Sequence, residues 1–128
     1  MGRQRDDAGA AVVDFVLVSV LLLGLFLLVF QVGVALHVRN VLIASAADGA
    51  RYGANADRTP REGAEQAQRV VAQALGARLA GAVRCEPVEG GTVDGAPVVD
   101  IRCTGPVPSL VGDALTLTVH GHALEEAR

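Results

Sequence analysis

The sequence is poor in aromatic residues and contains neither lysine nor tryptophan. Three of its four aromatic residues are Phe15, Phe26 and Phe30, in the first 30 positions, and the fourth is Tyr52. The remainder of the 128-residue chain is rich in Ala, Val, Gly and Leu, so any globular core there must be thin. A small domain with such a core often needs an additional constraint.

A strong charge of either sign is lacking too. The formal net charge is −3 at pH 7, and no basic patch alternates with aromatic residues, which argues against a nucleic-acid partner. The length suits one small domain plus an anchor and is too short for two independent domains.

No grouping of residues typical of a catalytic site is present. No Ser/His/Asp arrangement can be identified, and neither cysteine has the setting of a nucleophile. Gly90-Gly91 indicates a turn and lacks the lysine of a phosphate-binding loop. The sequence therefore predicts a protein that is not an enzyme and needs no cofactor.

Two histidines near the C-terminus are candidate metal ligands. His120 and His122 would lie on one face of a strand and could hold a metal with Glu125 or Glu126 as a third ligand. A solvated polar tail is the favoured interpretation at this position, so no metal site is predicted.

The most prominent feature that is present is a long apolar run. From Phe15 to Val38 the 24 residues FVLVSVLLLGLFLLVFQVGVALHV include no Asp, Glu, Arg or Lys. A helix of that length spans about 36 Å, enough to cross a hydrocarbon core of about 30 Å. A cleavable signal peptide is the alternative, but its apolar region is usually shorter, about 7–15 residues. The sequence predicts a single-pass transmembrane helix at about 15–38.

The charges that flank this helix are nearly balanced, because Arg3 and Arg5 precede it while Arg39 and Arg51 follow it. The short N-terminus and the cysteines in the C-terminal part favour an N-terminus inside and a C-terminal domain outside.

Asp14 is unusual, because it lies between four apolar residues, at 10–13, and the long apolar run. A charge at membrane depth is expensive. The macrodipole at the start of a helix would favour a carboxylate there, but this does not explain the apolar residues that precede it.

The segment MGRQRDDAG-AAVVDF resembles the class III signal of prepilins, and in particular the TadE-like family of tight-adherence pilus systems. In that family a polar leader ends in Gly, and a prepilin peptidase cuts after it on the cytoplasmic side. The resemblance places the cut between Gly9 and Ala10, with Asp14 fifth and Phe15 sixth in the mature chain. Asp14 stands where the family usually has Glu.

The resemblance further implies a pilin-like subunit of the bacterial cytoplasmic membrane. Its partners would be the prepilin peptidase, other pilin or pseudopilin subunits contacted through the N-terminal helix, the Tad assembly platform and membrane lipid. Asp14 and Phe15 would act in processing and assembly.

Beyond the membrane, the pattern predicts a small α+β domain. The first helix should continue to near Asn55, and a second should begin at Pro60, with Thr59 as N-cap and Glu62 completing a capping box. Alternating residues predict three antiparallel strands, with a break at Gly105–Pro108. The predicted strands are 82–87, 97–104 and 115–120, and the predicted divisions are a leader at 1–9, an N-terminal helix at 10–55 and an extracytoplasmic domain at 56–128.

Cys85 and Cys103 lie on the first two predicted strands and would face each other if these pair antiparallel. A disulfide between them would contribute roughly 3 kcal/mol. Two unrelated buried thiols are the alternative.

The favoured function is a TadE-like minor pilin or pseudopilin, cleaved after Gly9, in an adhesion or secretion apparatus. The alternative is an unprocessed, membrane-anchored accessory module that binds a partner.

Overall fold

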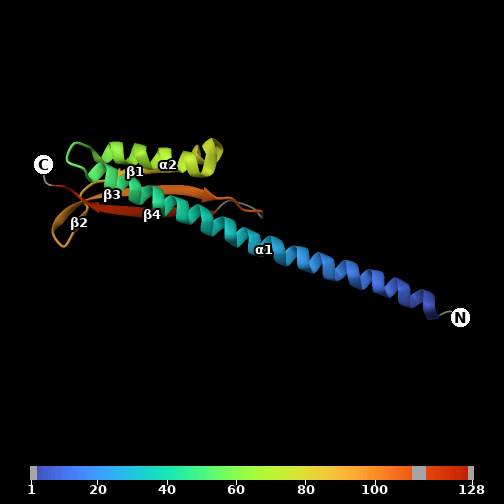
Figure 1. The fold of residues 1–128 in the computed structure, drawn as a ribbon. Coiled ribbons are helices and arrows are strands. Elements are labelled where there is room, and N and C mark those ends of the chain that lie inside the picture. The colour runs from blue at the N-terminus through green and yellow to red at the C-terminus, as the bar shows by residue number, and fades with distance from the viewer. Residues whose placement is uncertain (1–2, 111–114, 127–128) are drawn as a thin grey trace. The chain divides into compact units, whose positions relative to one another are not determined.

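The computed structural model of the protein describes residues 3–110 and 115–126, with side chains described from Gly9 onward. Helices α1 (Arg3–Ala54) and α2 (Pro60–Ala80) precede four strands (Figure 1). The strands are β1 (Arg84–Val88), β2 (Thr92–Val93), β3 (Ala96–Val107) and β4 (Leu115–Leu124). The predicted α+β architecture is confirmed, with four strands in place of three.

The chain divides into two compact units, Met1–Gly33 and Val34–Arg128. In the described part of the first unit, α1 is the only element, and its large apolar side chains are exposed. Phe15, for example, is 73% exposed. From Gly9 onward α1 is long and apolar enough to cross a membrane, which is compatible with a single-pass membrane protein.

The second unit is a two-layer structure in which helices cover one face of an antiparallel sheet (Figure 1). β3 lies between β1 and β4, and the short β2 pairs with the start of β3. In this register Cys85 is opposite Cys103, and Ile101 is opposite Gly121. The side chains of Ile101 and Cys103 point toward the helices and are fully buried.

Small residues let the helices approach the sheet and each other closely. Every fourth residue of α1 from Val38 to Ala54 is buried, and most of these residues are alanine. A Cβ atom on Gly49 would overlap the backbone of Gly63 in α2, and one on Gly121 would overlap the backbone of α1 at Ala46. Gly49, which looks in the sequence like a weak point of this helix, is therefore a contact point.

The start of α2 is as predicted. Thr59 is the N-cap, its hydroxyl accepts from the Glu62 N–H, and the Glu62 carboxylate accepts from the Thr59 N–H at 2.8 Å. This backbone hydrogen bond is the main cause of a lowered pKa at Glu62, and the Thr59 hydroxyl adds to it. Near its end α2 is interrupted at Gly76, where φ is 80°.

The predicted break in the second strand is wrong. β3 continues through Gly105 and Pro106 to Val107, paired with Leu117, Thr116 and Leu115 of β4. β1 pairs only with residues 100–104 of β3, so Pro106 lies where β3 has a single neighbour. A proline is tolerated there because the missing N–H faces no second strand.

Other strand ends also differ from the prediction, and the short strand β2 was not predicted. β1 begins at Arg84 and not at residue 82, and β4 continues from His120 to Leu124. The predicted Asp94-Gly95 turn is present, with positive φ angles of 51° and 80°. It joins β2 to β3 as a two-residue hairpin, the loop type that Asp-Gly favours.

Candidate functional site

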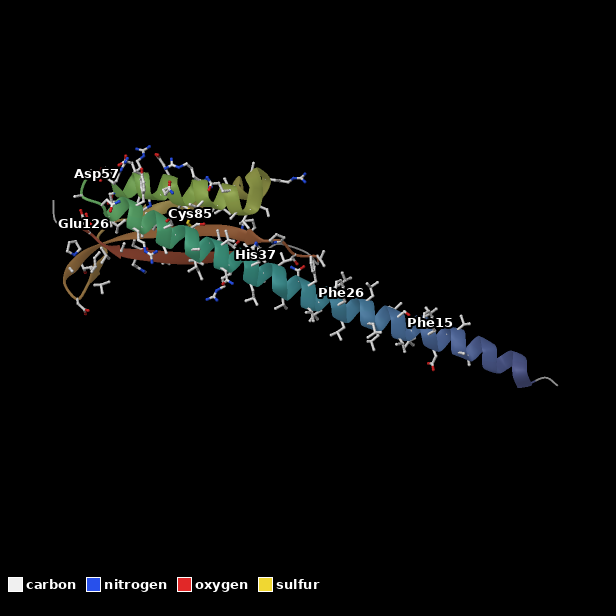
Figure 2. The ribbon with its side chains drawn as sticks, viewed as in Figure 1. Phe15, Phe26, His37, Asp57, Cys85 and Glu126 are labelled. Atoms are coloured by element: carbon white, nitrogen blue, oxygen red, sulfur yellow. A yellow bond between two sulfur atoms is a disulfide. The ribbon has the colours of Figure 1, made fainter. Side chains whose placement is uncertain are left out.

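The residues of the predicted prepilin motif lie together on the first part of α1. Gly9, Ala10, Asp14 and Phe15 are all helical and exposed, and Phe15 projects from the helix (Figure 2). Ala10 and Asp14 are four residues apart, which places them one turn apart on the same face. The first two residues of the predicted leader lie outside the described residues.

Gly9 has no packing role among the described residues. No heavy atom lies within 4 Å of the position that its Cβ would occupy. Glycine in a helix interior costs about 1 kcal/mol relative to alanine, so the helix alone would favour a different residue here. A reason for this glycine has to be sought outside the packing of the chain.

Cys85 and Cys103 form a disulfide, with an S–S distance of 2.08 Å, between directly opposed residues of β1 and β3. Cys103 is fully buried in the core, and Cys85 packs against the edge of that core. The bond closes a separation of 18 residues, which corresponds to roughly 3 kcal/mol in loop entropy.

Gln68 of α2 holds the turn into β1, and sequence reasoning missed it. Its Nε2 donates to the carbonyls of Ala80 (3.0 Å) and Val83 (2.9 Å), and its Oε1 accepts from the Cys85 N–H (3.2 Å). These groups belong to the segment where helix gives way to strand, and of the three the Ala80 carbonyl also accepts from the Val83 N–H at 3.2 Å. One glutamine in an alanine-rich helix carries no pattern that could have revealed this role.

The C-terminal histidines meet an aspartate on the outer face of the sheet. Nδ1 of His120 lies 3.2 Å from both carboxylate oxygens of Asp100, and Nε2 of His122 lies 3.5 Å from one of them. Glu125 and Glu126, suggested by the sequence as third ligands, follow the end of β4 and are not in this group. Asp100 takes their place because strand register, and not closeness in sequence, places it opposite His122.

Residues 9–51 match the family model described as TadE-like protein. The chain carries a TadE-like segment. The matched residues begin at Gly9, include Asp14 and Phe15 and continue through the apolar run into the second unit. No curated protein and no solved structure gave a significant match to the chain.

Proposed function

We propose that the protein is a minor pilin or pseudopilin-like subunit of a tight-adherence pilus or secretion apparatus, cleaved after Gly9 by a prepilin peptidase. In this proposal residues 1–9 are the leader, 10–55 the assembly helix with its membrane span at about 15–38, and 56–128 the extracytoplasmic part. Its partners are other pilin subunits, the Tad assembly platform and membrane lipid.

The observation that carries the proposal is the start of the TadE-like match at Gly9. This glycine is exposed and makes no close contact within the chain. A peptidase must reach an accessible backbone and open the helix locally, and glycine lowers the cost of both. Recognition by a peptidase would supply the reason for Gly9 that packing does not.

The position of Asp14 supports a role after cleavage. Removal of the leader would create a new ammonium group on Ala10, at the start of an apolar helix. The exposed carboxylate of Asp14 could neutralise this group on a neighbouring subunit, and breaking such a pair in an apolar setting is costly. The pair would therefore define the axial register of packed helices.

The exposed apolar surface of α1 supports the proposed partners. Large side chains from Val12 to Val32 are exposed around the helix, and Phe15, Leu21 and Leu28 are each more than 60% exposed. Leaving so much apolar surface in water is unfavourable. Lipid before assembly and neighbouring helices after it would cover this surface.

Cleavage is tested by producing the full chain together with a prepilin peptidase and determining the N-terminus by sequencing and intact mass. We expect the chain to begin at Ala10. Gly9→Leu should block the cut, whereas Gly24→Leu should not. The two variants are matched in packing, because neither glycine has a heavy atom within 4 Å of its Cβ position. An uncut wild-type chain, or a normally cut Gly9→Leu variant, would contradict the proposal and favour the anchored partner-binding module.

Assembly is tested by co-purification of the processed chain with partner pilins. Asp14→Ala should weaken co-purification at least tenfold, while Asp14→Glu, which restores the family's usual residue, should retain it. Asp57→Ala is the control, since Asp57 is an exposed carboxylate outside α1. Unchanged assembly of Asp14→Ala would refute the role of this carboxylate.

A further inference from the structure

The outer face of the sheet brings together three side chains that are typical metal ligands. Asp100 on β3 is directly opposite His122 on β4, and His120 lies two residues earlier on the same face of β4. One donor atom from each of the three side chains can be chosen so that all lie within 4.8 Å of one another. We propose that Asp100, His120 and His122 form a binding site for a divalent transition-metal ion of the zinc type.

The distances suit such an ion after small side-chain movements. Zinc lies 2.0–2.2 Å from nitrogen and carboxylate ligands, so the donor atoms of a tetrahedral site are about 3.4 Å apart. The two contacts to Asp100, at 3.2 and 3.5 Å, already match this spacing. The imidazole rings are nearly parallel, with centroids 6.1 Å apart, and only the separation between their donor atoms has to shorten.

Burial divides the three ligands into one anchored group and two adjustable ones. The side chain of Asp100 is 10% exposed, whereas those of His120 and His122 are 42% and 52% exposed. Gly91 packs closely here: a Cβ atom on it would lie 3.0 Å from Val98 Cγ2 and 3.7 Å from the Asp100 Cβ. The carboxylate is therefore held in place, while both imidazoles can turn toward an ion from the solvent side.

A nearly buried carboxylate also needs strong partners, because an unpaired buried charge is costly. Among the described residues, the two imidazoles are side-chain partners of the Asp100 carboxylate. Nitrogen and oxygen donors in a set of two histidines and one carboxylate suit zinc and similar ions, and leave a fourth position for water. Binding requires that the ring nitrogens facing Asp100 carry no proton.

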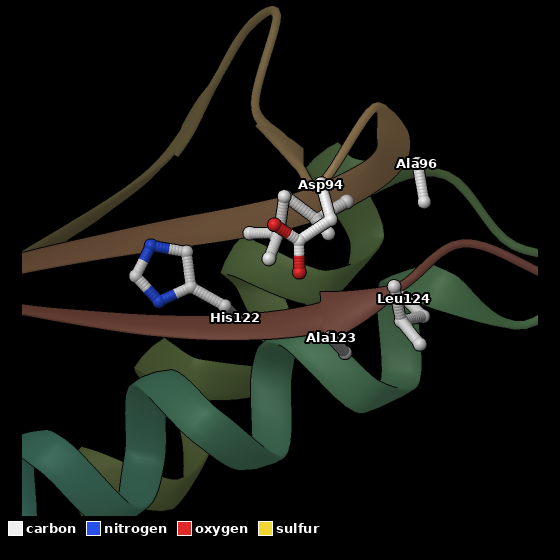
Figure 3. A pocket seen from close by; sticks show the side chains of 7 residues that line it. Asp94, Ala96, His122, Ala123 and Leu124 are labelled. Atoms are coloured by element: carbon white, nitrogen blue, oxygen red, sulfur yellow. The ribbon is translucent and has the colours of Figure 1, made fainter.

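The charge of the nearest cation, the Arg102 guanidinium, is partly offset by a carboxylate. Arg102, the cross-strand neighbour of His120, is paired with Glu86 at 3.6 Å, and Glu86 also contacts Arg84 at 3.9 Å. On the other side, His122 borders an open hollow that Asp94 also lines (Figure 3). Water can therefore reach the fourth coordination position from this hollow.

An ion at this position would add a constraint that the disulfide does not provide. The Cys85–Cys103 bond joins β1 to β3, whereas the metal would join β3 to β4. The three long strands would then be linked in series across a sheet whose helix-facing core is built from small residues. Because a folded site binds the ion far better than an unfolded chain, binding would raise the thermal stability.

The test uses the full chain in detergent micelles, without a polyhistidine tag and stripped of metal with a chelator. Titration with Zn²⁺ alone, followed by calorimetry, should show one ion per chain and a rise in Tm on saturation. His120→Gln, His122→Gln and Asp100→Asn should each weaken the affinity at least tenfold. His37→Gln on α1 and Glu125→Gln after β4 are the matched controls and should bind as the wild type does.

Absence of Zn²⁺ binding by the wild type would overturn the proposal. An unchanged Zn²⁺ affinity of His122→Gln would also overturn it. The same holds if the affinity of the control His37→Gln falls as much as that of the site variants, since either result indicates unspecific surface binding. Asp100→Asn could lower Tm in the absence of metal, because Asp100 is nearly buried. In that case the Zn²⁺ affinities of the two histidine variants decide whether the site exists, because their exposed rings can be replaced without disturbing the core. The test does not depend on cleavage at Gly9.

Discussion

The two units of the chain use glycine in opposite ways. In residues 9–33, Gly9, Gly24 and Gly33 have no heavy atom within 4 Å of their Cβ positions. In residues 34–128, by contrast, an added Cβ on Gly49 or Gly121 would overlap a neighbouring backbone. These three glycines of the first unit are thus free of intrachain packing, whereas Gly49 and Gly121 of the second unit set how closely the elements approach.

Apolar residues show the same contrast. In the first unit the Leu, Val and Phe side chains are large and exposed, and in the second the buried stripe of α1 is mostly alanine. Large exposed side chains provide surface for a partner outside the chain, while small buried ones allow close contacts within it. The first unit therefore offers the apolar surface that the proposed function assigns to lipid or other helices, and the second packs its own core.

The largest expected effect comes from filling the contact between β4 and α1. Gly121→Val should destabilise the second unit by about 3 kcal/mol or more, because its side chain would overlap the α1 backbone at Ala46 and Ala47. Thermal unfolding of the full chain in micelles measures this loss. Gly24→Val is the matched control and should leave the transition unchanged. Equal effects of the two variants would remove the contrast between the units.

Removal of the disulfide should have the next largest effect. The double variant Cys85→Ala/Cys103→Ala should lose about 3 kcal/mol, since the unfolded chain regains the entropy of the open loop. Denaturant unfolding with and without a reducing agent measures the loss, and the reductant should not affect the double variant further. The helical signal of the first unit should persist under reduction, because it contains no cysteine.

Gln68→Ala should cost about 2 kcal/mol. It would remove the hydrogen bonds that Gln68 makes with the Cys85 N–H and the Val83 carbonyl, and leave the Ala80 carbonyl with the Val83 N–H. Chemical denaturation measures the change, with Gln73→Ala on the exposed side of α2 as control. A wild-type stability in Gln68→Ala would show that water replaces these hydrogen bonds without loss.

The smallest effect concerns the charge of Glu62. Its pKa is lowered in the folded state, so its charged form contributes stability above its usual pKa of 4.5, and this contribution is lost as the pH falls through the folded-state pKa. Glu62→Gln keeps a side chain that can still cap the helix. The difference in Tm between the wild type and this variant should therefore narrow from pH 7 toward pH 3. A difference that is independent of pH would contradict a role for the charge.

Local patterns in the sequence predicted much of the fold. The end of α1 near Asn55, the capping box at Thr59 and Glu62, and the Asp94-Gly95 turn all depend on residues close together in the chain. The prepilin motif is local as well, which is why the sequence alone could indicate the TadE-like match. Its role in cleavage and assembly stays a proposal, because it concerns partners outside the chain.

What the sequence determined by itself is therefore the helical and turn chemistry, together with an apolar segment long enough to cross a membrane. The tertiary structure decided which strands pair, how far β3 extends past Pro106, and that Asp100 meets His120 and His122. It also decided that Gly121 is a contact point for α1. The physical reason is the same in each case: helix caps and turns are made by neighbours in sequence, whereas strand register and close packing join residues that only the folded chain brings together.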